Sequence, residues 1–142
     1  MTDVPVPVTD ADLGAARIVR EAVYRAAKAL IDGQPPAAED QAVINRAAEA
    51  PPPVPRMDGG ALMLAPVWPG SAASALSAVA RDAISLFTSP DVKSLRECAS
   101  PECGLLFVDL SRPGRRRWCS SDACGGKARA ASYRRRRTTA AP

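Results

Sequence analysis

The residues most capable of chemistry in this chain are its four cysteines, which all lie in the last third of the sequence. They are Cys98, Cys103, Cys119 and Cys124, so that two Cys-x4-Cys pairs are separated by fifteen residues. Each pair reads Cys-x-Ser-x-x-Cys-Gly, which predicts two similar turns that each present two thiolates. Four thiolates at such spacing are typical of a tetrahedral Zn²⁺ site, and a site with four protein ligands is structural rather than catalytic.

Two other interpretations of the cysteines are open, namely two disulfides or free cysteines in a core. Disulfides need an oxidising compartment. The N-terminal segment Met-Thr-Asp-Val-Pro lacks the charged and apolar regions of a secretory signal peptide. The sequence therefore favours a cytoplasmic protein that holds a structural zinc ion.

The composition of the 142-residue chain argues against an enzyme and against a membrane protein. Histidine is absent, which removes the commonest general base and every Ser-His or Cys-His nucleophilic pair. Acidic pairs such as Glu39-Asp40 fall on a side of a helical pattern that we expect to face solvent. No stretch is long and apolar enough for a membrane span. We expect neither catalysis nor a membrane partner.

Charge is divided unevenly along the chain. Residues 93–142 carry 12 Lys and Arg against 4 Asp and Glu, a net charge of +8, whereas residues 1–92 carry 7 against 11, a net charge of −4. The basic residues close to the cysteines are Arg112, Arg115, Arg116, Arg117, Lys127, Arg129, Arg134, Arg135, Arg136 and Arg137. Cations on a fixed scaffold suit the phosphates of a nucleic acid, and a merely solvated helix end is the alternative.

The elements that must position these residues begin with a helical body. Apolar residues at helical spacing predict a helix over Asp10–Ile31, which a capping box of Thr9 and Asp12 would start. A weaker helical pattern covers residues 37–48 and stops before the prolines at 51–53.

A hairpin and a third helix complete the predicted body. Two short runs between Val54 and Val67 flank the turn Asp58-Gly59-Gly60, which favours a β-hairpin. A strong helical pattern then runs from Ser71 to Phe87 and ends at Ser89-Pro90.

The cysteine module follows as a set of short elements. Strand-like runs cover Val92–Glu97 and Leu105–Leu110, and Arg115–Trp118 reads as a short third strand. A helix over Ser121–Arg136 follows, with Ser121 or Asp122 as its N-cap. Four consecutive arginines cannot share one helix face, so the run at 134–137 predicts a frayed helix end or a flexible arm.

A knuckle, a hairpin and a helix that supplies the last ligand form a treble-clef-like arrangement. The module has few apolar residues to offset its conformational entropy, whereas structural zinc supplies roughly 10 to 16 kcal/mol. The predicted fold class is therefore mainly α with a small β-hairpin in the body, followed by a small treble-clef-like α+β zinc finger.

The cysteine module resembles the CGNR zinc-finger family over about Leu95–Arg137. The shared features are the Cys-Gly-x-x-Phe after the first pair, the Ser-Arg, the Arg-Arg-Trp-Cys-Ser and the basic Tyr-Arg helix. The family's name-giving Cys-Gly-Asn-Arg reads Cys124-Gly125-Gly126-Lys127 here. Gly126 lowers helix propensity by about 1 kcal/mol relative to Ala, and Lys127 lacks the planar fork of Arg. We expect the metal site to carry over and the nucleic-acid contact beside it to be weaker.

In such proteins an ABATE domain, mostly helical with a small hairpin, precedes the finger, and the resemblance implies a stress-induced transcription regulator. Residues 9–90 are similar to the second half of that domain, which predicts a shortened relative or a start codon placed late. We therefore expect a partial ABATE-like helical domain at 1–90, a CGNR-type zinc finger at 91–137 and a disordered tail at 138–142.

Two functions of different classes follow from these features. The first is a bacterial-type DNA-binding transcription regulator, whose zinc module docks on the duplex and whose body senses a signal or forms a homodimer. The second is a zinc-stabilised module that binds an acidic protein or RNA, for which only Phe107, Trp118 and Tyr133 could stack on bases. No motif identifies a small-molecule effector.

Overall fold

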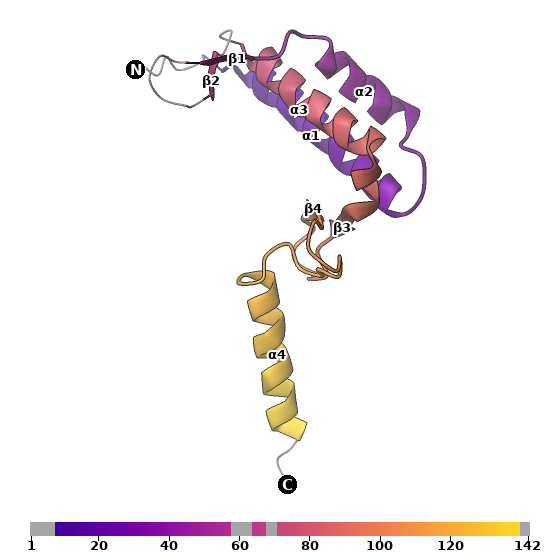
Figure 1. Ribbon diagram of the computed structural model, residues 1–142, viewed down its shortest axis with the longest axis vertical. Coiled ribbons are helices and arrows are strands. Elements are labelled where there is room, and N and C mark those ends of the chain that lie inside the picture. The colour runs from indigo at the N-terminus through magenta and orange to yellow at the C-terminus, as the bar shows by residue number, and fades with distance from the viewer. Residues whose placement is uncertain (1–7, 58–63, 68–70, 140–142) are drawn as a thin grey trace.

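The computed structural model describes residues 8–57, 64–67 and 71–139. Three helices with a two-stranded hairpin between the second and third form the body, and a short 3-10 helix, a second hairpin and a long final helix follow (Figure 1). The four described helices, the antiparallel hairpin and the C-terminal cysteine cluster confirm the predicted fold class.

The first helix, α1 (Asp10–Ile31), has the predicted bounds. The Asp12 amide donates to Thr9 Oγ1 at 3.2 Å, and the Thr9 amide donates to Asp12 Oδ2 at 2.9 Å, so the predicted capping box is present. The helix ends at Asp32, and Gly33 follows with a φ of 70°, which a residue with a side chain adopts only with strain.

The helices α2 (Ala38–Ala48) and α3 (Ala72–Thr88) pack on α1 through small side chains. The buried core consists of Ala22, Ala26, Ile44 and Ala80, with larger apolar residues packed around it. Alanines allow the helix axes to approach closely, which is why a chain with few aromatic residues can still bury a core.

Hydrogen bonds from buried serines tie α3 to the segment that follows α2. The Ser77 hydroxyl is fully buried and donates to the Ala50 carbonyl at 2.5 Å, and Ser74 donates to the Pro51 carbonyl at 2.6 Å. Arg25 of α1 pairs through two nitrogens with Asp40 of α2, which is buried and does not face solvent as predicted. Because Ser74, Ser77 and Asp40 are buried, these bonds give their polar groups the partners that burial requires.

The predicted first hairpin is confirmed in its strands. β1 (Val54–Met57) pairs antiparallel with β2 (Leu64–Val67), with Val54 opposite Val67 and Met57 opposite Leu64. The turn Asp58-Gly59-Gly60 lies outside the described residues.

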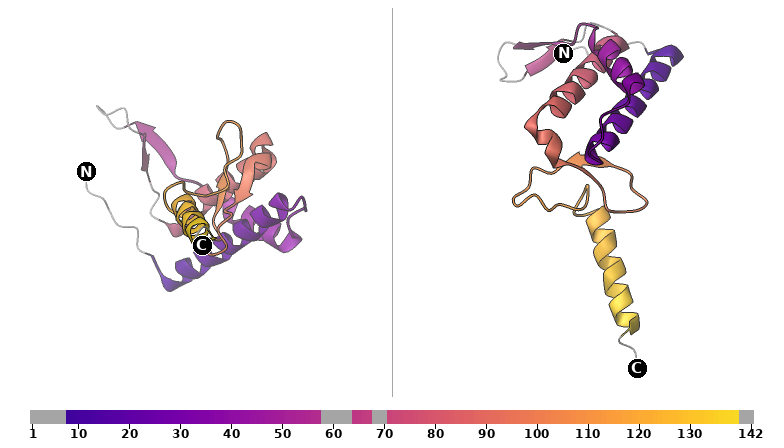
Figure 2. Two further views of the ribbon diagram at one scale, coloured as in Figure 1. Left: turned by 90° about the horizontal axis from the view of Figure 1, so that it is seen from below. Right: turned by 90° about the vertical axis from the view of Figure 1, so that its right-hand side faces the viewer.

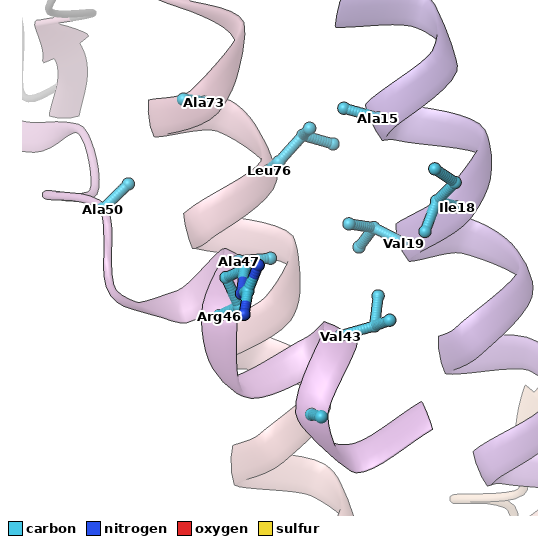
Figure 3. A pocket seen from close by; sticks show the side chains of 10 residues that line it. Ala15, Ile18, Val19, Val43, Arg46, Ala47, Ala50, Ala73 and Leu76 are labelled. Carbon is cyan, nitrogen blue, oxygen red and sulfur yellow. The ribbon is translucent and has the colours of Figure 1, made fainter. Parts of the chain in front are cut away.

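An apolar groove of about 540 Å³ lies between α1, α2 and α3. Figure 3 shows Ile18 and Val19 of α1, Val43 of α2 and Leu76 of α3 around this space. Alanines on all three helices also line it, and their short side chains leave the volume unfilled. Among the described helices, none combines the length and the apolar character needed to cross a membrane.

The second module begins with η1 (Pro90–Ser94), which replaces the first half of the predicted strand at 92–97. The Ser89 hydroxyl accepts from the Asp91 amide at 3.2 Å, and Pro90 suits the first turn of a helix, so this segment coils before it extends. β3 (Leu95–Glu97) then pairs antiparallel with β4 (Leu106–Val108), and β3 also contacts α1.

No strand forms at Arg115–Trp118 in the described part of this module, so the prediction of a third strand is wrong. The backbone groups of this segment have other partners. The Arg116 amide donates to Asp109 Oδ2 at 2.9 Å, and the Arg117 carbonyl accepts from the Ala99 amide at 2.8 Å.

The last helix, α4 (Cys124–Thr139), projects away from the body, as Figure 2 shows. Neither Ser121 nor Asp122 caps it, because residues 121–123 form a turn in which Ser120 Oγ accepts from the Ala123 amide at 3.1 Å. The arginine run 134–137 is helical and not a frayed end or an arm. The helix also continues through residues 138 and 139, where a disordered tail was predicted, and residues 140–142 lie outside the described part.

Candidate metal centre and basic surface

The four cysteine sulfurs meet in one cluster, in which every sulfur lies within 4.8 Å of every other. The Sγ atoms of Cys103 and Cys119 are 3.5 Å apart, and those of Cys119 and Cys124 are 3.7 Å apart. A tetrahedron of sulfurs about 2.3 Å from a central zinc has edges of about 3.8 Å. A disulfide would hold two sulfurs at about 2.05 Å, and all four cysteines are free. The donor set therefore has the spacing of metal ligands.

Short hydrogen-bonded turns place the first two sulfurs. Cys98 directly follows β3, and its amide donates to the Leu105 carbonyl at 2.9 Å. The Cys103 amide donates to the Ser100 carbonyl at 3.0 Å, which closes the knuckle. Gly104 follows with a φ of 63°, so the Cys-Gly of the first repeat meets a backbone requirement.

The second pair is held between a loop and the start of α4. The Cys119 amide donates to Cys98 Sγ at 3.4 Å, and Cys124 is the first residue of the helix. Gly125 is buried, and its amide donates to the Ser120 carbonyl at 3.0 Å. A Cβ at Gly125 would lie 3.2 Å from Trp118 Cδ1, so the glycine of the second repeat serves close packing and not a left-handed backbone.

Crowding separates the proton affinities of the sulfurs. The backbone amide of Cys119 lowers the pKa of Cys98 to about 7. The neighbouring Cys103 raises the pKa of Cys119 to about 12 and also raises the pKa of Cys124. Four thiolates at these distances repel one another strongly, so only a cation between them allows all four to lose their protons. The donor chemistry thus fits a soft divalent metal ion.

Comparison with known families matches both halves of the chain. The model of the CGNR zinc finger matches residues 94–137. The model of ABATE, described as a putative stress-induced transcription regulator, matches residues 1–90, which is more than half of the chain. The chain belongs to the ABATE family. A search among curated proteins found no match.

The basic residues of the CGNR finger lie in two places. Arg112, Arg115, Arg116 and Arg117 belong to the loop between β4 and Cys119, which we call the arginine loop (residues 110–118). Lys127, Arg129 and the run 134–137 lie on α4, beyond the cluster (Figure 1).

The side chains of the arginine loop differ in their surroundings. The Arg116 guanidinium donates to two backbone carbonyls and lies 4.9 Å from the centre of the Phe107 ring. Arg117 stacks on Trp118 at 5.3 Å. Arg112 and Arg115 are exposed, and their side chains and that of Lys127 form no hydrogen bond or ion pair with the residues that the structure describes. On α4, Arg129 donates to the Ser121 carbonyl at 3.0 Å.

Sequence reasoning missed Asp109, which organises the arginine loop of the CGNR finger. Its side chain is buried and accepts from the Ser111 hydroxyl at 2.5 Å, the Arg116 amide at 2.9 Å and the Ser111 amide at 3.0 Å. The Ser111 hydroxyl is the main cause that lowers the pKa of Asp109. An Asp-x-Ser triplet directly after an apolar run is typical of an Asx turn, and this pattern could have indicated the role of Asp109 from the sequence.

Proposed function

We propose that this chain is a zinc-finger DNA-binding protein that regulates transcription. Its four cysteines would hold one structural Zn²⁺, and the arginine loop and α4 would contact duplex phosphates. The observation that carries the proposal is the four-sulfur cluster at the base of a basic helix that projects from the body. The match to an ABATE transcription-regulator domain supports the same function.

The four ligands come from two segments of the finger, and a bound metal ion would join these segments. Cys98 and Cys103 flank the knuckle after β3, and Cys119 and Cys124 join the arginine loop to α4. A bound Zn²⁺ neutralises the thiolates and crosslinks these segments. Because all four donors are protein side chains, no open coordination position remains for a substrate, and we propose no catalytic role.

The arrangement of charge supports a polyanionic partner. The arginine loop precedes the third ligand and the first turn of α4 carries Lys127, so cations from two elements are held by the same cluster. Phosphate contacts that are fixed in this way orient a protein on a duplex without reading its sequence. Sequence specificity would come from side chains of α4 that reach base edges.

A salt titration of the zinc-loaded full chain on a DNA duplex tests the proposal. Binding should weaken with salt, with a log–log slope of about −0.9 for each phosphate that is neutralised. Removal of zinc by a chelator should abolish the binding, because the arginine loop and α4 then lose their common anchor. Absence of a duplex shift at low salt with zinc loaded would refute the proposal.

RNA or an acidic protein is the alternative partner. Stacking on single-stranded bases needs several open aromatic faces, but Arg116 and Arg117 already lie over Phe107 and Trp118, which leaves exposed Tyr133 as the third candidate. We therefore favour duplex DNA, and an RNA competitor that displaces the duplex at equal nucleotide concentration would favour the alternative.

In this proposal the helical body forms a homodimer or senses an effector. Exposed Leu13, Ile18 and Val79 and the groove between the helices of the body offer apolar surface for either role.

A further inference from the structure

Arginines 115 and 116 are neighbours of the same type in the sequence, but the structure gives them different surroundings. We propose that Arg116 is a positioning residue of the metal centre, and that in the arginine loop and the first turn of α4 the phosphate contacts are made by Arg112, Arg115 and Lys127. The second half of this inference rests on the proposed DNA binding, whereas the first half does not.

The Arg116 side chain is hydrogen-bonded to the backbone at the third cysteine. Its Nε donates to the Trp118 carbonyl at 2.8 Å, and its Nη2 donates to the carbonyl of Cys119, the third cysteine of the cluster. The two carbonyls belong to consecutive residues, so the guanidinium fork fixes the backbone that presents the Cys119 sulfur. Groups that orient metal ligands in this way typically change metal affinity by 10- to 100-fold when they are removed.

Further contacts fix Arg116 at its other end. The guanidinium lies over the half-buried Phe107 ring of β4, and the Arg116 amide donates to the buried carboxylate of Asp109. Arg116 therefore joins β4 to the ligand segment. Two of its five N–H groups already bond to the Trp118 and Cys119 carbonyls, so this guanidinium is less available to a phosphate than those of Arg112 and Arg115.

Arg115, Arg112 and Lys127 have no comparable attachment. All three are exposed, and their side chains form no hydrogen bond or ion pair within the described ranges 8–57, 64–67 and 71–139. Their charges can meet phosphates without disturbing the cluster. Lysine in place of arginine keeps a point charge but loses the planar two-donor fork, so this substitution separates the two roles.

The experiment compares Arg116→Lys and Arg116→Gln with Arg115→Lys and Arg115→Gln in the full zinc-loaded chain. The first readout is the transfer of zinc to a competing chelator. Both Arg116 variants should bind zinc at least about 10-fold more weakly than the wild type, because neither Lys nor Gln reproduces the two-donor fork of the guanidinium. Both Arg115 variants should hold zinc like the wild type.

The second readout is the salt slope of duplex binding, measured at saturating zinc. Arg115→Gln should reduce the slope by about 0.9, and Arg115→Lys should leave it unchanged. Arg116→Gln should leave the slope unchanged. Arg17→Gln is the matched control, because it removes one exposed charge from α1 and should alter neither readout.

Phe107→Leu gives a test of Arg116 that changes no charge. Loss of the stacking surface should weaken zinc binding, although less than Arg116→Lys does. Wild-type zinc retention in both Arg116→Lys and Phe107→Leu would overturn the positioning role, as would a slope change of about 0.9 in Arg116→Gln. If the wild type binds no duplex, the proposed function and the phosphate half of the inference fail, and zinc retention alone still decides the role of Arg116.

Discussion

Two adjacent glycines at the start of α4 provide a matched test of how the finger is packed. A Cβ at Gly125 would lie 3.2 Å from Trp118 Cδ1, 3.4 Å from Arg129 Nη1 and 3.4 Å from the Ser120 carbonyl oxygen. A Cβ at Gly126 would have no such neighbour within 4 Å. Both positions are helical, and neither glycine has a positive φ. Alanine at each site therefore changes the helix propensity equally and the packing differently.

The expected magnitudes follow from these surroundings. Alanine favours a helix interior over glycine by about 1 kcal/mol, so Gly126→Ala should stabilise the zinc-loaded finger by up to that amount. Gly125→Ala has the same gain but must displace Trp118 or the Ser120 carbonyl, and such overpacking costs about 1 to 3 kcal/mol. Its net effect should lie between no change and a loss of about 2 kcal/mol.

Competition for zinc with a chelator measures both variants on one scale, since folding of the finger and metal binding are coupled. At 1.4 kcal/mol per tenfold, Gly126→Ala should bind zinc up to about fivefold more tightly, and Gly125→Ala up to about thirtyfold more weakly. Equal stabilisation by the two alanines would refute the packing argument, because it would show that Trp118 does not restrict Gly125.

Three further predictions concern the body and the metal. Thr9→Ala should lower the free energy of unfolding by about 1 kcal/mol in urea titrations at pH 7. The Thr9 side chain also lowers the pKa of Asp12 below its usual value of 3.8. The stability that this interaction contributes is therefore complete above pH 3.8 and is lost as the pH falls through the folded-state pKa of Asp12. The free energy of unfolding of Thr9→Ala should depend less on pH in that range. Ser77→Ala should cost about 1 to 3 kcal/mol by thermal unfolding, because the Ala50 carbonyl loses a buried donor. Removal of zinc should lower the far-ultraviolet helical signal only partly, since the core of α1, α2 and α3 contains no cysteine; a complete loss would contradict this separation.

Elements governed by local rules could be predicted from the sequence. The capping box at Thr9 and the apolar spacing gave the bounds of α1, and the paired cysteine spacing predicted a single cluster. These signals depend on residues three to five positions apart, which is the range over which local backbone geometry acts.

The errors lie where the hydrogen-bond partner that decides the backbone cannot be identified from residue type. The sequence predicts a short strand at Arg115–Trp118, but the Asp109 carboxylate accepts from the Arg116 amide and the segment stays irregular. Ser121 and Asp122 are good N-caps by type, yet the turn from Ser120 delays the helix to Cys124. The Asp109 partner could not be assigned before the arginine loop was folded around the cluster, and Ser120, Ser121 and Asp122 are all suitable caps by type.

The same loop shows why a count of basic residues overstates a phosphate interface. A zinc ion with four thiolates carries a formal charge of −2. Close to this site, the guanidinium of Arg116 donates to the Cys119 carbonyl and that of Arg129 donates to the Ser121 carbonyl. These cations offset local charge and are already hydrogen-bonded, so part of the net +8 stabilises the finger itself. Ten phosphate contacts would give a salt slope of about −9, whereas contacts from Arg112, Arg115 and Lys127 alone would give about −2.7. Contacts from Arg129 and the arginines 134–137 of α4 in addition would give about −7.2, so a slope between about −2.7 and −7.2 indicates how many of them reach the duplex.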